Sequence, residues 1–180
     1  MAPIPHFHAS GREPSAFTRA FQEEQRRRLP FDDDRDFEEA RRGFIARPDY
    51  DKIMADAGNV AWDMGRYEFL LEGEDFDSIH PSLQRQAILN MDYGVYEVME
   101  GVYQVRGFDL ANLTFVRGAA GWIVLDTGTD VETARAAHAI VRQHVEDLPV
   151  TAVIHSHSHI YHFGGVRGLI DEADVRAGTV

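Results

Sequence analysis

Residues 150–168 read VTAVIHSHSHIYHFGGVRG, and this stretch decides how the fold is interpreted. Its first five residues are largely apolar and rich in β-branched side chains, which predicts a short buried strand. Four histidines follow within eight positions, and the pair Gly164 and Gly165 comes directly after them. The chain therefore places a polar constellation at the carboxyl end of a strand, where ligands collect in layered α/β folds.

The histidine run favours metal binding over a metal-free histidine cluster. Crowded imidazolium ions repel one another, and neutral imidazole is the commonest metal ligand. If the segment is extended, side chains two residues apart point the same way, so His157 and His159 are expected to converge on one ion. His162 lies one turn further if the chain has begun to coil, and it is placed to serve a second ion. Zinc binds imidazole nitrogens and keeps a position open for water in catalytic sites.

The segment upstream of this run has the periodicity of strands followed by a helix. Alternating apolar and polar residues predict two hairpins, and an apolar stripe at helical spacing predicts a helix over 131–145. Asp126 ends the last predicted strand. A carboxylate near ligating imidazoles fixes their tautomer, and a plain turn or helix-cap role is the alternative for Asp126 and for Asp130. The predicted hairpins are 95–99 with 102–106, and 113–117 with 122–126.

The first 50 residues are polar and strongly charged, and they predict two helices over 15–28 and 32–42. Acidic residues begin the second helix and Arg41 ends it, an order that suits the helix dipole. The interpretation is a solvated helical arm. We expect residues 1–88 to form this N-terminal arm and residues 89–180 to form a separate domain.

Composition excludes several classes of function. The 180 residues have a formal net charge of −12, which argues against nucleic acid as a partner because phosphate binding needs basic patches. No cysteine is present, which excludes disulfides, thiolate zinc sites and cysteine nucleophiles. The opening MAPIPHFHAS lacks the pattern of a secretory signal, and no run approaches the roughly 18 apolar residues that span a bilayer. As given, the sequence predicts a cytoplasmic protein without a membrane span.

Three segments narrow the interpretation to one family. They read GVYQVRGFDLANLTFV at 101–116, GWIVLD at 121–126 and HSHIYHFGGVRG at 157–168. Together they resemble the start of the metallo-β-lactamase domain of the linear alkyl sulfatases (alkyl sulfohydrolases). Weaker likeness extends upstream to about residue 45. The resemblance implies an α+β fold, of which residues 89–180 supply the first half of an αββα sandwich.

The resemblance also implies a two-zinc site that hydrolyses alkyl sulfate esters such as dodecyl sulfate with a metal-activated water. His157 and His159 match the first two histidines of the family motif HxHxDH, which bind one zinc ion. His162 matches the last histidine, which binds the other. The aspartate of the motif is Tyr161 here, and a neutral phenol is a poor substitute for an anionic ligand. His155 is an additional histidine that is a candidate to compensate.

Length is a second departure from the family, whose members are several times longer. The sequence is therefore expected to be an N-terminal fragment, and the resemblance implies homodimers for full-length relatives. Two alternatives stay open. One is a hydrolase of the same fold that acts on another ester or on a thioester. The other is an inactive, truncated remnant, which the early stop and Tyr161 both favour.

Overall fold

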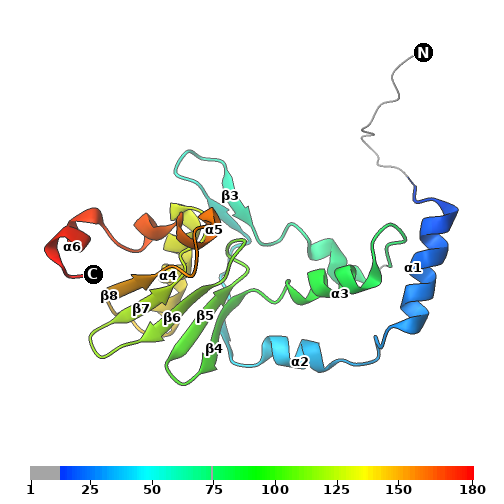
Figure 1. Cartoon of the computed structure of the whole chain (residues 1–180), viewed down its shortest axis with the longest axis horizontal. Coiled ribbons are helices and arrows are strands. Elements are labelled where there is room, and N and C mark those ends of the chain that lie inside the picture. Colours follow the sequence, from blue (N-terminus) through cyan, green and yellow to red (C-terminus); the bar gives the residue numbers. More distant parts are fainter. Residues whose placement is uncertain (1–12, 74) are drawn as a thin grey trace, which may run out of the picture.

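A six-stranded mixed sheet forms the body of the chain, and helices extend from it to one side (Figure 1). The computed structural model describes residues 13–73 and 75–180, so the predicted absence of a signal in MAPIPHFHAS falls on residues outside the described part. The sheet runs in the order β1-β4-β5-β6-β7-β8, and all neighbours are antiparallel except β7 and β8, which are parallel. Its strands are β1 (Phe44–Ala46), β4 (Gly94–Met99), β5 (Val102–Arg106), β6 (Leu113–Arg117), β7 (Trp122–Leu125) and β8 (Val150–Ile154).

Both predicted hairpins are confirmed, because β4 pairs with β5 and β6 pairs with β7 along the expected segments. Gly101 turns the first hairpin at a φ of 76°, in the left-handed region that glycine enters without steric cost. The predicted strand at 150–154 is also present as β8.

Helix α4 (Val131–His144) packs on one face of the sheet and joins β7 to β8. It begins at Asp130, whose side chain accepts a hydrogen bond from the Thr133 amide, so the helix-cap interpretation of Asp130 is confirmed. The core between helix and sheet is fully buried at its centre, where Trp122 contacts Phe115 edge to face. The mixed α+β class predicted from the sequence is confirmed.

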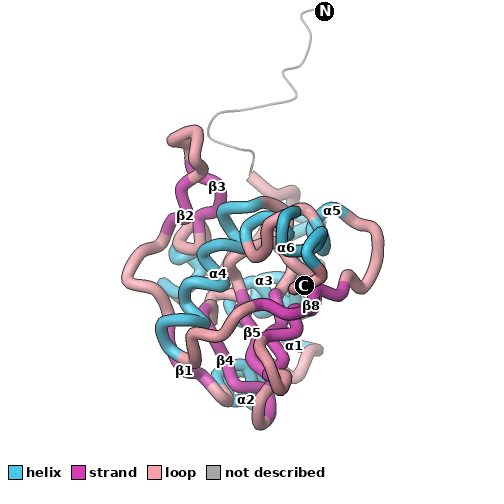
Figure 2. The backbone as a smooth tube through the Cα atoms, turned by 90° about the vertical axis from the view of Figure 1, so that its left-hand side faces the viewer, coloured by secondary structure: helices cyan, strands magenta, loops and turns pink. Residues whose placement is uncertain are grey.

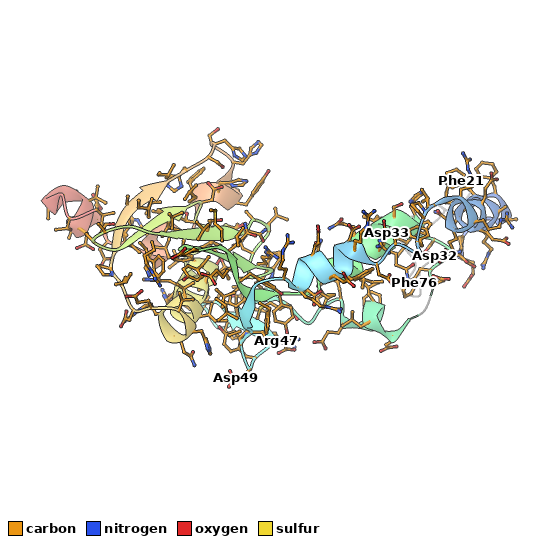
Figure 3. All side chains as sticks on the ribbon, turned by 90° about the horizontal axis from the view of Figure 1, so that it is seen from below. Phe21, Asp32, Asp33, Arg47, Asp49 and Phe76 are labelled. Atoms are coloured by element: carbon orange, nitrogen blue, oxygen red, sulfur yellow. The ribbon has the colours of Figure 1, made fainter. Side chains whose placement is uncertain are left out.

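The N-terminal part contains both predicted helices, α1 (Ala16–Arg28) and α2 (Arg35–Arg41). Figure 3 shows Phe21, Asp32, Asp33 and Phe76 at the far end of the molecule from the sheet, whereas Arg47 and Asp49 lie beside it. The remaining helices are η1 (Glu68–Glu72), α3 (Pro81–Leu89), α5 (Ile160–Phe163), η2 (Val166–Gly168) and α6 (Glu172–Ala177).

Residues 44–63 add three strands that the sequence pattern did not predict. β1 pairs with β4 and forms one edge of the main sheet. β2 (Lys52–Met54) and β3 (Val60–Asp63) form a separate hairpin that contacts α4 and rises above it in Figure 2. The predicted arm therefore contributes to the body of the fold, and a boundary between residues 88 and 89 stays a prediction.

Candidate metal centre

The parallel pairing of β7 and β8 brings two distant loops to one edge of the sheet. Leu125 lies opposite Ile154, and the next amide, that of Asp126, donates to the Ile154 carbonyl at 2.9 Å. Asp126 and the histidine run therefore leave the carboxyl ends of neighbouring strands side by side. Asp126 has a φ of 59°, a left-handed conformation that aspartate tolerates better than most residues.

His157 and His159 lie on bends and not on a strand. β8 ends at Ile154, residues 156–159 form consecutive bends, and α5 begins at Ile160. The extended conformation on which the predicted convergence depended is therefore wrong. The expected coiling before His162 is confirmed, because His162 lies within α5.

His157 and His159 nevertheless face one another. The Nε2 atom of His157 lies 2.9 Å from the Nδ1 atom of His159. The hydroxyl of Tyr161 lies 3.1 Å from the same His159 nitrogen, so the residue at the motif's aspartate position borders the pair. Both histidines are exposed, which leaves their nitrogens accessible from solvent.

Asp126 holds the other side of the cluster. Its Oδ2 lies 2.7 Å from Nδ1 of His162 and accepts from the Ser156 hydroxyl at 2.8 Å, while its Oδ1 accepts from the Ser156 amide at 2.8 Å. Burial raises the pKa of this carboxyl, but the hydrogen bonds from Ser156 and His162 outweigh burial and bring the pKa below its ordinary value. A carboxylate therefore faces His162, in contact as predicted.

His155 is turned toward the backbone. Its Nδ1 lies 3.0 Å from the carbonyl oxygen of His162, to which it donates, and its ring meets Phe163 edge to face. One of its two nitrogens is thus used by the chain itself. That His155 replaces the motif's aspartate as a metal ligand stays a prediction, and the orientation of its ring does not favour it.

Two glycines let the turn carrying the histidines lie directly on the loop after β7. A Cβ atom on Gly164 would be 2.1 Å from the Thr129 carbonyl oxygen, and one on Gly165 would be 2.1 Å from that of Thr127. Only glycine, which has no Cβ atom, fits at these two positions. The Thr127 amide also donates to the His162 carbonyl at 2.9 Å, which ties the two loops together.

Asp109 holds the loop after β7 by hydrogen bonds, a role that the sequence did not reveal. Its side chain is buried, and it accepts from the Thr129 amide at 2.8 Å, from the Thr129 hydroxyl at 2.6 Å and from the Thr133 hydroxyl. These bonds fix the segment on which Gly165 rests. A buried carboxylate so fully hydrogen-bonded is structural, and a lone aspartate within GFDLAN gives no signal for this role.

Other histidines of the described chain have ordinary structural places. His80 precedes α3 and accepts from the Ser82 amide through Nδ1. His138 lies in the helix stripe of α4 and stacks on Phe115. His6 and His8 lie outside the described residues.

The donor chemistry fits zinc in part. Two imidazole nitrogens point at one place between His157 and His159, and His162 is held by a carboxylate through Nδ1, the outer contact that ligating histidines usually make. Across residues 13–73 and 75–180, however, no three histidine or carboxylate side chains surround a common point. The described chain therefore has two facing donor nitrogens, on His157 and His159, and a third on the neighbouring His162. These three do not surround one point.

A cavity of about 680 Å³ lies elsewhere, between α3, β3 and the loop after β5. Trp62, Met91 and Tyr93 line it together with Asp63 and Asp109, but none of the run's four histidines does. Asp109 is thus the residue shared between the cavity wall and the network that supports the candidate metal centre.

Comparison with known proteins shows what the chain is similar to. The model of the metallo-beta-lactamase superfamily matches residues 106–180. A solved structure, the stereoselective inverting sec-alkylsulfatase from Pseudomonas sp., superimposes with a TM-score of 0.87 and 49% identity, covering 96% of this chain and 27% of that one. Residues 106–180 are thus similar to the metallo-beta-lactamase superfamily.

Curated relatives that this chain matches are sulfatases. An (R)-specific secondary-alkylsulfatase from Pseudomonas sp. is 51% identical over 92% of this chain and 25% of its own length. An alkyl/aryl-sulfatase from Saccharomyces cerevisiae is 41% identical over 84% of this chain and 24% of its own. The chain thus spans about a quarter of the length of the curated relatives it matches. Among the described residues, no helix is long and apolar enough to cross a membrane.

Proposed function

We propose that this chain carries part of a zinc-dependent hydrolase site for alkyl sulfate esters. His157 and His159 would hold one zinc ion, and His162 would hold a second. The observation that carries the proposal is the pair of imidazole nitrogens that face each other at 2.9 Å beside His162. Similarity to alkylsulfatases over more than nine-tenths of the chain supports the substrate class.

The chain's own residues prepare these donors. Asp126 accepts the Nδ1 proton of His162, so the Nε2 atom of that ring keeps its lone pair for a cation. The carboxylate also makes the His162 ring a stronger ligand for a metal ion. Bound zinc supplies Lewis-acid chemistry, which polarises a water molecule and the ester.

Charge explains why a cation is needed for this substrate. The chain carries a formal net charge of −12, which repels an anionic sulfate ester. Local positive charge from metal ions offsets that repulsion where the ester binds. The alkyl tail requires an apolar groove, which is a further part of the proposal.

Tyr161 favours a second candidate function, a metal-binding chain without hydrolytic activity. Its hydroxyl is 3.1 Å from His159 Nδ1, where the resemblance places a carboxylate ligand. A neutral phenol brings no negative charge to a second ion. The two candidates share the donors at His157 and His159 and differ in whether a second ion binds.

Zinc content and hydrolysis test the proposal together. The chain and Tyr161→Asp are dialysed against zinc, and bound metal is counted by mass spectrometry. Release of sulfate from dodecyl sulfate is then followed by ion chromatography. We expect two zinc ions in the chain, a second ion held more tightly in Tyr161→Asp, and hydrolysis that follows occupancy of the second site. If neither form retains zinc, the assignment of the three histidines is wrong.

Two further measurements separate the alternatives. Zinc without sulfate release in both forms supports the metal-binding chain. Cleavage of a thioester or carboxylic ester, with dodecyl sulfate untouched, supports the hydrolase of another ester. Homodimer formation belongs to the same proposal, and light scattering on the zinc-loaded chain tests it.

A further inference from the structure

Ser156 lies between two members of the candidate metal centre, and the sequence analysis assigned it no role. Its hydroxyl oxygen is 2.8 Å from Asp126 Oδ2 and 2.9 Å from Nδ1 of His157. A hydroxyl has one proton to donate and lone pairs with which to accept. The direction of each of these two hydrogen bonds therefore determines the other.

The carboxylate fixes that direction. An ionised carboxylate only accepts hydrogen bonds, so the Ser156 hydroxyl donates its single proton to Asp126. If the hydroxyl donated to His157 instead, two oxygen lone pairs would oppose each other at 2.8 Å. The Ser156 oxygen is consequently an acceptor toward His157, and the proton of that ring is on Nδ1.

A proton on Nδ1 leaves Nε2 of His157 with a free lone pair. That atom is the one that faces His159 at 2.9 Å. In the metal-free chain, His159 Nδ1 carries a proton and donates it to His157 Nε2 in a hydrogen bond. A bound cation would replace that proton. The tautomer of His157 therefore decides whether its inward nitrogen can accept a cation.

His162 provides an independent arm of the same network. Its Nδ1 is 2.7 Å from Asp126 but 3.4 Å from the Ser156 oxygen, so its proton goes to the carboxylate. Asp126 thus orients His162 directly and orients His157 through a serine hydroxyl. Loss of the hydroxyl is expected to release one ring and not the other.

We propose that Ser156 is a positioning residue that sets the tautomer of His157 so that its unprotonated Nε2 faces His159. The importance of this tautomer for metal binding rests on the proposed function, whereas the tautomer itself does not. The variant Ser156→Ala removes the relay, and Ser156→Thr keeps a hydroxyl at the same place.

Nitrogen NMR of the metal-free chain in mildly alkaline buffer tests the inference. The ¹⁵N shifts of each imidazole show which nitrogen carries the proton. We expect Nδ1 protonation of both His157 and His162 in the chain and in Ser156→Thr. In Ser156→Ala, His157 should change to the other tautomer or to a mixture, while His162 stays unchanged. An unchanged His157 in Ser156→Ala overturns the inference, and so does a joint change of both rings, which would show that Ser156 holds the whole turn.

A Co²⁺ titration, read by the visible spectrum, gives the consequence for the metal. Loss of an outer hydrogen-bond partner typically weakens metal binding by about tenfold to 100-fold. We expect a weakening of that order in Ser156→Ala and near-normal binding in Ser156→Thr. Equal affinity in all three forms overturns the role of Ser156. A chain that binds no Co²⁺ contradicts the proposed function instead, and the tautomer measurement still decides this inference.

Discussion

His138 and His162 are the same side chain in two opposite settings. His138 stacks on Phe115 with ring centroids 6.0 Å apart, and its buried Nε2 has no hydrogen-bond partner among the described residues. His162 lies at the surface edge of the sheet, 17% exposed, and it is bonded to Asp126. One histidine is held by packing against a core side chain, and the other is held by a hydrogen bond to a carboxylate.

Hydrogen-bond partners, and not burial, therefore define the candidate site. The core around His138 depends on packing, so its residues are sensitive to a change of size. The histidine turn depends on hydrogen bonds between polar side chains, so its residues are sensitive to a change of chemistry. Substitutions that change only size or only chemistry test this difference between the two regions.

The largest effect is expected in the core. Trp122→Ala removes a fully buried side chain between Tyr103 and Phe115 and should lower the free energy of unfolding by about 3–5 kcal/mol. His159→Ala, at an exposed position, should change it by less than about 0.5 kcal/mol. Urea unfolding followed by circular dichroism measures both. Comparable losses in the two variants would contradict the division between core and site.

A matched variant sharpens this test. The indole nitrogen of Trp122 has no hydrogen-bond partner among the described residues. Trp122→Phe removes that unpaired donor and keeps an aromatic ring, so it should cost much less than Trp122→Ala.

The next effect is expected where the two regions meet. Gly165→Ala would place a methyl group 2.1 Å from the Thr127 carbonyl oxygen and should cost about 1–3 kcal/mol of stability. It should also move His162 and weaken zinc binding. Gly178→Ala is the control, because its backbone is left-handed but no atom lies within 4 Å of the added group. Calorimetry measures the loss of stability, and titration measures the zinc affinity. Unchanged zinc affinity in Gly165→Ala would show that the contact of Gly165 with Thr127 does not position His162.

Asp126→Asn alters chemistry at almost constant size. Asparagine tolerates the left-handed backbone, but a neutral amide holds the His162 proton more weakly than a carboxylate. Zinc affinity should fall about tenfold to 100-fold, with little loss of stability. Asp130→Asn is the matched control, because asparagine caps a helix as well as aspartate does. Isothermal titration calorimetry distinguishes them, and equal affinities would remove Asp126 from the site.

The smallest effect is a pH dependence that belongs to the core. Burial lowers the pKa of His138, with a further contribution from the charge of Arg142, so the folded state favours the neutral ring. Stability from this group is complete above the unfolded pKa of about 6.5 and is lost as the pH falls toward the lower folded pKa. The slope for one proton is at most about 1.4 kcal/mol per pH unit.

Replacement of His138 shows whether the core histidine causes that slope. Urea unfolding at a series of pH values should give a shallower acid decline for His138→Phe than for the parent chain. His144→Phe, at an exposed position of the same helix, should keep the parent slope. A parent slope in His138→Phe would assign the pH dependence to other groups.

Local periodicity was sufficient to predict the central sheet and α4. Residues 103–106 alternate apolar and polar, and the burial of β5 follows the same alternation. β1 escaped prediction because three residues carry no period, and its pairing with β4 joins positions about fifty residues apart. The chain's short strands are thus specified by tertiary contacts and not by their own pattern.

The histidines of the candidate site could be predicted from the sequence, but the hydrogen bonds that orient them could not. Spacing identified His157, His159 and His162, and the end of a strand identified Asp126. Ser156 could not be found in this way, because a serine in a turn is ordinary and its role depends on a carboxylate thirty positions earlier. The bends after β8 were also unpredictable, since they follow from contact with the loop after β7.

The parallel pairing of β7 and β8 has a consequence for assembly of the chain. Asp126 follows one strand and the histidines follow the other, so His162 gains its carboxylate partner only after β8 has docked beside β7. An ion that prefers this arrangement acts as a clamp on the final strand of the sheet. At a hundred times its dissociation constant, such an ion stabilises the folded chain by about 2.7 kcal/mol, which makes the melting temperature a gauge of strand closure.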